Sequence, residues 1–588
     1  MKATNKKPVQ KPLPQPKPKP EIKQPSAVSK QYLFWGLFAL IFVISILAFL
    51  PMANNGFIST WDDSIYVIQN KLLPDLSWQG IVNIFSYGDD LQKQINNYHP
   101  ITILSLALNY KFSGLSPASY HITNMVFHSF NALLVYFFTF YLSRRRILPA
   151  IISGLLFALH PMHVESVAWV SERKDVLYTF FFLGGLISYL KYLEDEKTWK
   201  LAVAFLLFLF SCLSKAMAVP FPIILLLIDY LNRRNFSWKL IVEKIPFFGL
   251  ALVIGWMSVH LQAISAINKF ETFTFYQRIM HASFGFVTYI QKFFFPGDLS
   301  AFYPYPAITS TGFLPLQFRV APFVCLAIVV LLILLAIRKK EMPRIMVFGI
   351  LFYFFTIALV LQFLSVGLAI MAERYTYIPY IGLVFIIGMV ADFFIQKKSS
   401  VKYVGWGLSV ATGILCLVFF FKTNDRTKVW KNDISLWSDV LEQYTDGRVN
   451  FIYEKRAEKY LEKDEYEAAL SDYLAITTNN PSNTLALESI GRIYGKYYND
   501  LGKAIEYLEK AYATDPKNPT VLSSLGVAMG IKGDFTKSLD YLLQAYELNN
   551  SDTSLMLNIS ASYKNLGMTE KAKLIDRQIE ALRTKKGS

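Results

Sequence analysis

Cysteine is nearly absent from this sequence. The 588 residues include three cysteines, Cys212, Cys325 and Cys416, and each lies inside a run of apolar residues. Their spacing matches neither a zinc site nor a disulfide-linked small domain. The sequence therefore predicts no disulfide framework and no cysteine-based metal site, and we interpret the three thiols as small buried hydrophobic groups.

Charged residues are also scarce, and they are unevenly placed. They make up 17% of the chain, 53% of the residues are hydrophobic, and the formal net charge is +16. A strongly basic chain can indicate nucleic-acid binding. Here eight lysines lie in the first 30 residues, and most other basic residues fall in short loops between apolar runs. That distribution is typical of the cytoplasmic loops of a membrane protein, so we predict no nucleic-acid partner.

Long apolar runs fill the chain up to Lys422 and are missing after it. A helix of about 20 apolar residues spans the hydrocarbon core of a bilayer. The sequence thus predicts an all-α membrane domain over residues 31–421 and a water-exposed part over 422–588. We expect about 11 crossings, of which 200–213 and 216–231 are short enough to be tilted or broken helices: 31–51, 120–142, 147–166, 176–193, 200–213, 216–231, 245–263, 317–337, 345–369, 379–395 and 403–421.

The charge pattern also predicts an orientation. Residues 1–30 are rich in Pro and Lys and are expected to form a disordered cytoplasmic tail. The run that follows lacks a small-residue cleavage site, so we do not interpret it as a signal peptide. With the N-terminus inside, the dense Lys and Arg clusters fall in inside loops. Residues 52–119 and 264–316 are then long outside segments, the second interfacial or re-entrant, and 422–588 lie outside.

The last part of the chain repeats with a period near 34 residues. Ala504, Ser538 and Ala572 recur at that spacing, and Gly491 and Gly526 occupy related small-residue positions. This period is typical of tetratricopeptide repeats, in which helix pairs stack into an α-solenoid. A peptide-docking surface is the functional interpretation, and a structural lid or dimer contact is the alternative.

Two adjacent carboxylates lie in the first outside loop, in "FISTWDDSIY". Asp62 and Asp63 stand about ten residues past the end of the first apolar run. Neighbouring carboxylates raise each other's pKa, and one of them near an apolar boundary can act as a general base. Solvated loop charges are the alternative interpretation.

Several other charged or titratable residues fall at predicted outside turns, where membrane proteins keep charge for function. Alternatives are an interfacial hydrogen bond for His99, snorkelling for Lys215 and a local ion pair for Glu373 and Arg374. His160 and His163 share a helix face only if the helix persists past Pro161, and no third ligand follows at a fixed spacing. We therefore predict no metal site. The full set is His99, His160, His163, Glu165, Arg173, Lys174, Asp175, Lys215, Glu373 and Arg374.

An acidic pair and several cations on one side of a membrane suit an enzyme with a lipid-phosphate donor. Cations would hold the leaving phosphate, and a carboxylate would take the proton of an incoming hydroxyl. A transporter would instead favour carboxylates near mid-membrane and inverted repeats, and neither is seen. A non-catalytic repeat scaffold in the membrane is the other alternative.

Several motifs occur in one order: "WDDSIYVIQN", "NNYHPITILSLALNY", "FALHPMHVESVAWVSERKDVLY", "LSKAMAVPFP" and "AERYTYIPYIG". Together with the repeats they resemble the transmembrane and tetratricopeptide-repeat containing O-mannosyltransferases and their bacterial relatives, which are glycosyltransferases of GT-C type. The resemblance implies a polyprenyl-phosphate sugar as donor substrate, no covalently bound cofactor and a protein acceptor. Dependence on a divalent metal stays open.

The same resemblance assigns roles to residues. It implies that Asp62 and Asp63 form the catalytic acidic pair, with Asp62 as base, and that Arg173 and Arg374 bind phosphate. Lys174, Lys215 and His99 follow as further phosphate or donor contacts. His160, His163, Glu165, Asp175 and Glu373 are supporting candidates. The implied setting is a bacterial inner membrane, with the N-terminus cytoplasmic and the repeats periplasmic, where they could hold the acceptor polypeptide.

Overall fold

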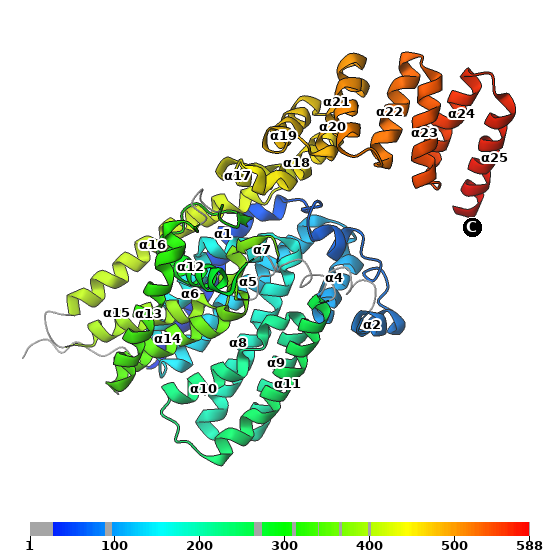
Figure 1. Cartoon of the computed structure of the whole chain (residues 1–588). Coiled ribbons are helices and arrows are strands. Elements are labelled where there is room, and N and C mark those ends of the chain that lie inside the picture. Colours follow the sequence, from blue (N-terminus) through cyan, green and yellow to red (C-terminus); the bar gives the residue numbers. More distant parts are fainter. Residues whose placement is uncertain are drawn as a thin grey trace, which may run out of the picture.

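The computed structural model of the chain describes residues 27–88, 97–263, 273–307, 313–338, 340–363, 367–397 and 402–586. The predicted tail, residues 1–30, lies outside the described residues except for its last four, which begin helix α1 (Ala27–Phe49). Figure 1 shows a helical bundle at one end of the molecule and a curved row of shorter helices leading away from it.

Seven helices are long and apolar enough to cross a membrane by length and composition. They are α1, α5 (Pro117–Leu142), α8 (Arg173–Asp195), α11 (Trp238–Ala263), α13 (Leu316–Ile337), α14 (Glu341–Ile357) and α16 (Lys402–Val429). The bent pair α6 (Ile147–Leu159) and α7 (Val164–Ala168) would be an eighth. Three shorter apolar helices are α9 (Thr198–Ser214), α10 (Phe221–Leu231) and α15 (Tyr380–Ile395).

Each predicted crossing overlaps one of these helices or the bent pair. The prediction of an all-α, multi-pass membrane domain is therefore confirmed. The count of eleven is not: among the described residues seven helices qualify, or eight with the bent pair, so the larger number stays a prediction. At the centre of the bundle α5 packs on α1, α6 and α8, while α15 packs on α6, α14 and α16.

The bend between α6 and α7 shapes one end of the bundle. His160 is extended (φ −71°, ψ 123°) and precedes Pro161, which cannot donate to the helix and disfavours helical geometry in the residue before it. The chain therefore turns by 56°. The short helix α7 then brings Glu165 into the interior, where the residue is fully buried.

The loop over residues 52–119, which the sequence predicts to lie outside, is folded onto the same end of the bundle. Its core of Tyr66, Val67, Leu73, Ile103 and Leu106 packs with residues of the bundle. Thr102 Oγ1 also donates to the carbonyl of Ser214, at 2.9 Å, at the end of α9. The regular elements of this part of the chain are η1 (Leu50–Asn54), η2 (Ser64–Ile68), α2 (Trp78–Phe85) and α4 (Pro100–Ser113).

The second segment that the sequence predicts to lie outside, residues 264–316, is described in part. Residues 264–272 and 308–312 lie outside the described residues. Between them α12 (Phe275–Phe294) is not among the helices that qualify as spans, and its interfacial or re-entrant placement stays a prediction. The strands β1 (Tyr303–Pro304) and β2 (Ala369–Met371) pair antiparallel beside it. Short 3-10 turns join the helices: η3 (Pro161–His163), η4 (Val170–Glu172), η5 (Ala216–Ala218), η7 (Ala358–Val360), η8 (Glu373–Thr376) and η9 (Gly447–Val449).

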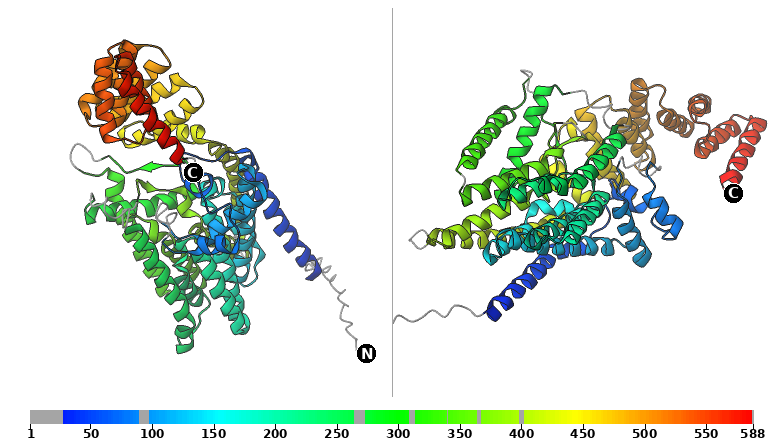
Figure 2. Two further views of the ribbon diagram at one scale, coloured as in Figure 1. Left: turned by 90° about the vertical axis from the view of Figure 1, so that its right-hand side faces the viewer. Right: turned by 90° about the horizontal axis from the view of Figure 1, so that it is seen from below.

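The C-terminal helices form the predicted α-solenoid. They stack in consecutive pairs, and the row rises from the bundle in every view (Figures 1 and 2). A Cβ on Gly526 would lie 2.5 Å from Leu542 Cγ, which explains the small residues at the helix crossings. Helix α16 carries the chain from the bundle toward this row, so the predicted boundary at residue 421 lies within a helix. The row comprises α17 (Asp433–Gln443), α18 (Asn450–Glu462), α19 (Tyr466–Asn479), α20 (Thr484–Lys496), α21 (Leu501–Thr514), α22 (Pro519–Lys532), α23 (Phe535–Leu548), α24 (Thr553–Asn565) and α25 (Thr569–Lys586).

Candidate active site

The two adjacent carboxylates have opposite environments. Asp63 is fully buried and accepts hydrogen bonds from the backbone N–H of Ile58 and of Ser171, both at 2.9 Å, and from the Ser171 hydroxyl. Burial raises the pKa of Asp63 from 3.8 to about 7 despite these bonds. The Asp62 side chain is 38% exposed and lies 3.4 Å from Lys174 Nζ. Asp63 therefore ties the loop to η4, and Asp62 is the member of the pair that an incoming molecule can reach.

Behind Asp62 lies a buried network of charges centred on Glu172. Its carboxylate is 3.2 Å from Lys174 Nζ, 3.1 Å from Lys215 Nζ and 3.4 Å from Arg374 Nε. Lys215 also pairs with Asp175 at 2.5 Å. Buried charges are stable only when paired and hydrogen-bonded, and these residues satisfy one another. Chain segments far apart in sequence, η4, α8, the α9–η5 turn and η8, are brought together here.

Arg374 is the most accessible cation of the network, with 18% of its side chain exposed. Nη1 pairs with Glu165, which also accepts from the Arg374 backbone N–H at 2.9 Å. The guanidinium carbon lies 5.5 Å from the centre of the Trp169 ring. Nη2 has no hydrogen-bond partner among the described residues, so one donor pair of the fork is free to bind an anion.

His99 reaches the network through Tyr66. Its Nδ1 and the Tyr66 hydroxyl are 3.1 Å apart, and Lys174 Nζ stands 4.6 Å from the centre of the Tyr66 ring. Burial, together with the charges of Lys174 and Lys215, holds the pKa of His99 well below its ordinary value. His99 is thus a neutral ring that orients Tyr66, and Tyr66 in turn contacts Lys174.

The structure turns Arg173 away from this network, although the sequence placed it with the phosphate-binding candidates. Its guanidinium is fully buried. It donates to the carbonyl of Tyr120 and to the side chains of Ser105, Asn109 and Asn124. With four of its donors used inside the fold, Arg173 anchors α4 and α5 to α8. Lys174, the next residue along α8, is the one that faces Asp62.

Three supporting candidates also lie apart from the acidic pair. His160 and His163 are fully buried and bond to the carbonyls of Phe293 and Phe157, at 3.0 and 2.9 Å. Glu373 accepts from the Ser300 backbone N–H at 2.7 Å and from the Tyr303 hydroxyl at 3.0 Å. Burial raises the pKa of Glu373 to about 7. All three hold elements together and do not face Asp62.

Sequence reasoning missed a tryptophan cluster beside Asp62. The Trp61 ring centre is 4.2 Å from that of Trp169 and 5.1 Å from that of Trp437, and Trp430 packs on Trp169. Trp437 belongs to the first solenoid helix, α17, and its Nε1 donates to Thr60 Oγ1 at 2.8 Å. Four of the ten tryptophans pack together here. Because they come from distant segments of the sequence, their spacing could not predict this cluster.

The solenoid is fastened to the loop that carries the acidic pair. Asp433 accepts from the backbone N–H and hydroxyl of both Ser59 and Thr60, at 2.5 to 3.2 Å. Lys455 Nζ donates to the carbonyl of Thr60 at 2.5 Å. The first helices of the row therefore lie directly beside Asp62, a position that sequence spacing could not predict.

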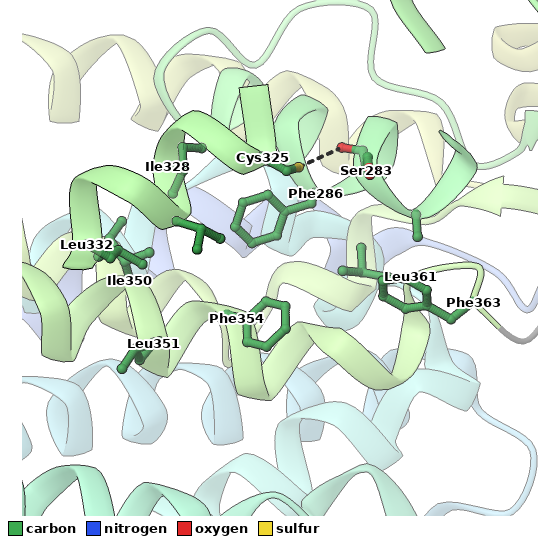
Figure 3. Close-up of a pocket in the computed structure, with 12 residues that line it drawn as sticks. Ser283, Phe286, Cys325, Ile328, Leu332, Ile350, Leu351, Phe354, Leu361 and Phe363 are labelled. Carbon is green, nitrogen blue, oxygen red and sulfur yellow. Dashed lines mark hydrogen bonds between the residues drawn. The ribbon is translucent and has the colours of Figure 1, made fainter. Parts of the chain in front are cut away.

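An apolar cavity of about 170 Å³ opens between α12, α13 and α14 (Figure 3). Phe286, Phe354 and Leu361 line it, and Cys325 on its wall donates to the carbonyl of Ser283. Phe286 is one helical turn before Tyr289, whose hydroxyl bonds to the backbone of Ala372. Ala372 is two residues before Arg374, so these hydrogen bonds link helix α12, which lines the cavity, to the segment that carries Arg374.

Metal-ligating side chains do not gather within the described part of the chain: it holds no group of three or more His, Cys, Asp or Glu side chains suited to a metal ion. Asp62, the accessible carboxylate, faces Lys174.

Comparison with known proteins identifies relatives. No family model matches the chain. A protein O-mannosyl-transferase of Caenorhabditis elegans, F38B6.6, is 25% identical over 415 residues, covering 68% of this chain and 56% of the worm protein. The human protein O-mannosyl-transferase TMTC3 is 33% identical over 138 residues, covering 23% of this chain and 14% of its own. The chain thus spans about half the length of the worm relative, and less of the human one.

Comparison with solved structures finds similarities with low TM-scores. MamA is 15% identical with a TM-score of 0.24, covering 26% of this chain and 88% of its own. The Cut9–Hcn1 complex is 12% identical with a TM-score of 0.24, covering 84% and 82%. Both scores are too low to carry an argument. The sequence relatives support the resemblance: this chain is similar to proteins named protein O-mannosyl-transferases, among them TMTC3.

Proposed function

We propose that this protein is a membrane glycosyltransferase that moves a sugar, mannose being favoured, from a polyprenyl-phosphate donor to Ser or Thr hydroxyls of extracytoplasmic proteins. The observation that carries the proposal is the accessible Asp62 paired with Lys174 at 3.4 Å, at the edge of the Glu172 network. The names of the relatives, protein O-mannosyl-transferases, support the same reaction class.

Asp62 is the proposed general base. The acceptor oxygen attacks C1 of the sugar, the bond from C1 to the phosphate oxygen breaks, and the phosphate leaves with the bonding electrons. Asp62 takes the hydroxyl proton, and the contact with Lys174 orients its carboxylate before attack. Attack from the face opposite the phosphate inverts the configuration at C1. Asp63 positions the loop and takes no proton.

Arg374 and Lys174 are the proposed phosphate contacts. Arg374 has an unused donor pair, and Lys174 can turn from Asp62 to the leaving group as negative charge develops there. Lys215 is held by Glu172 and Asp175 and orients the network from behind. The apolar cavity near Phe286 would receive the first units of the lipid chain, since the hydrogen bond between Tyr289 and Ala372 links its wall helix α12 to the segment that carries Arg374.

The solenoid is the proposed site for the acceptor polypeptide, because its first helix contacts the loop beside Asp62. In this arrangement the acidic pair and the repeats share one side of the membrane. We place them in the periplasm of a bacterium, with the N-terminus in the cytoplasm, following the charge bias of the loops.

A transfer assay tests the proposal. Purified protein in detergent receives polyprenyl-phosphate carrying radiolabelled mannose, glucose or N-acetylhexosamine, with a pool of secreted proteins as acceptors. We expect label to enter protein from one donor, most strongly mannose. The matched carboxylate control, Asp425→Asn, changes an exposed residue of α16 and should transfer normally. Absence of transfer from every donor would contradict the proposal and favour a scaffold.

A further inference from the structure

A second cluster of cations lies at the opposite end of the bundle from Asp62. Arg144 follows α5, Arg233 follows α10, and Arg344 lies in the first turns of α14, and all three line one pocket of about 230 Å³. Helix α8 separates the two ends: Arg173 and Glu194 lie at its two termini, about 30 Å apart at the rise of an α-helix. The cluster is therefore distinct from the proposed active site.

Within the described part of the chain the three arginines have no acidic partner: Arg144 and Arg233 are exposed, and Arg344 is half-buried. The guanidinium carbon of Arg344 lies 5.5 Å from the centre of the Tyr230 ring. Among the described residues, none of them forms an ion pair, whereas the neighbouring Arg145 pairs with Glu194 and Arg146 with Glu341 and Asp392. Two guanidinium nitrogens of Arg344, Nε and Nη1, are buried without a hydrogen-bond partner there. The one carboxylate at the pocket, Glu341, is the partner of Arg146.

Ordinary helix capping explains part of this arrangement but not all of it. A cation just after a helix is favourable because the last carbonyls carry partial negative charge, which accounts for Arg144 and Arg233. Both also hold left-handed backbone conformations, with φ of 58°, which cost free energy in a residue other than glycine. Arg344 near the start of α14 faces the positive end of its helix. The positive charge of Arg344 is unfavourable at this end of the helix, and a bound anion would compensate it.

The remaining walls of the pocket suit a lipid. Leu231, Phe385 and Met389 line it beside the arginines, so charge and apolar surface meet at the end of the membrane-spanning helices. An adjoining pocket shares Glu341, Ile345 and Met389 and adds Arg146 and Lys397. Basic pockets between helices at this level bind phospholipid headgroups.

We propose that Arg144, Arg233 and Arg344 form a binding site for the phosphodiester of an anionic phospholipid, on the membrane face opposite the acidic pair. The arginines bind the phosphate oxygens with charge-assisted hydrogen bonds, and the acyl chains lie along Leu231, Phe385 and Met389. Such a lipid links the ends of α5, α10 and α14 and stabilises their packing. The inference does not depend on the glycosyltransferase assignment.

The test measures lipid binding by the full-length protein in detergent. Melting temperature and native mass spectrometry are followed during titration with phosphatidylglycerol, phosphatidylcholine or inorganic phosphate. We expect phosphatidylglycerol to raise the melting temperature and remain bound, with much weaker effects of the other two probes. Arg144→Gln, Arg233→Gln and Arg344→Gln combined should weaken this binding by at least about tenfold, since a single hydrogen bond to a charged group already contributes about that factor.

A matched control changes three exposed lysines of the solenoid, Lys463→Gln, Lys517→Gln and Lys532→Gln, and should bind as the wild type does. Should the triple variant fail to fold, Arg344→Gln alone gives the same comparison. Equal binding of phosphatidylglycerol by wild type and variants would overturn the proposal. Equal stabilisation by phosphatidylcholine would also overturn it, and equal stabilisation by inorganic phosphate would replace the lipid with a free-anion site.

Discussion

The solenoid and the end of the bundle that carries Glu172 use charge in opposite ways. Around Glu172 the charged groups are buried and each is paired with others, as in the contact of Lys215 with Asp175, whose side chains are 9% and 1% exposed. In the solenoid a typical pair, Lys510 with Glu506, is more than half exposed on both sides. Breaking a buried pair costs several kcal/mol, whereas an exposed pair contributes little. Burying the charged groups of the bundle costs stability that the exposed pairs of the solenoid do not cost. This cost indicates that the buried charges serve a function.

The sharpest way to test this comparison is to remove the central carboxylate. Glu172→Ala leaves Lys174, Lys215 and Arg374 without a shared partner, and we expect a loss of about 3–5 kcal/mol of folding free energy. Glu506→Ala, in the exposed solenoid pair, should cost less than about 1 kcal/mol. Thermal unfolding of both variants in the same detergent measures the contrast, and equal shifts would show that burial does not distinguish the two regions.

A double change separates charge balance from function at Arg374. Arg374→Met leaves the buried carboxylate of Glu165 without its ion-pair partner and should lower the melting temperature strongly. Adding Glu165→Gln removes the unpaired charge and should restore much of the stability. Transfer activity should stay low in the double variant because the phosphate contact is still missing. Recovery of activity together with stability would assign Arg374 a structural role alone.

In the solenoid, packing should matter more than charge. A larger side chain at Gly526 meets Leu542, since even a Cβ would lie 2.5 Å from Leu542 Cγ. Gly526→Leu should cost about 1–3 kcal/mol and open α22 and α23 to limited proteolysis. Gly502→Leu, where the nearest contact of a Cβ is Asp500 at 3.6 Å, is the control. Transfer to a short peptide acceptor should persist in both, and its loss would mean that the two regions are not separable.

The junction of the two regions gives a smaller effect. Asp433→Ala removes the carboxylate that accepts from Ser59 and Thr60. Amide hydrogen exchange in this loop should become about tenfold faster, because hydrogen bonds to a charged group are lost. Asp425→Ala on α16 should leave the loop unchanged. Unaltered exchange in Asp433→Ala would show that the other contacts, the tryptophan cluster and Lys455 with Thr60, hold the loop against the solenoid without Asp433.

A further expected effect is a pH dependence of stability from Asp63. Its pKa is raised in the folded state, from 3.8 to about 7, so between these values the folded protein binds more protons than the unfolded chain. Stability from this group is therefore lost as pH rises from about 4 to about 7. Melting temperatures measured from pH 5 to 7.5 should fall more steeply in the wild type than in Asp63→Asn, and parallel curves would contradict the assignment.

Much of the architecture was predictable from periodicity. Apolar runs located the membrane helices, and the 34-residue period located the solenoid, because both signals are local in sequence. The directions of single side chains were not. Arg173 and Lys174 are consecutive, but successive residues on a helix point about 100° apart, so one anchors α4 and α5 while the other faces Asp62. The same limit applies to Asp62 and Asp63, of which only the fold shows which is buried.

The central role of Glu172 had no local signal either. Its partners Lys215 and Arg374 are some 40 and 200 residues away, as their numbers in the sequence show. Only the packing of η4, the α9–η5 turn and η8 reveals that three cations share one carboxylate. The resemblance to the O-mannosyltransferases singled out these segments, and the structure shows how the residues within them lie relative to one another.

The most direct test of the account is the single-turnover rate of sugar transfer by Asp62→Asn, with donor affinity measured in the same preparation. A general base contributes about 10²–10⁴-fold to such a step. We predict a loss of rate of at least about a hundredfold, with donor binding retained and normal transfer by Asp425→Asn. Transfer by Asp62→Asn at the wild-type rate would contradict the central claim and exclude Asp62 as the base.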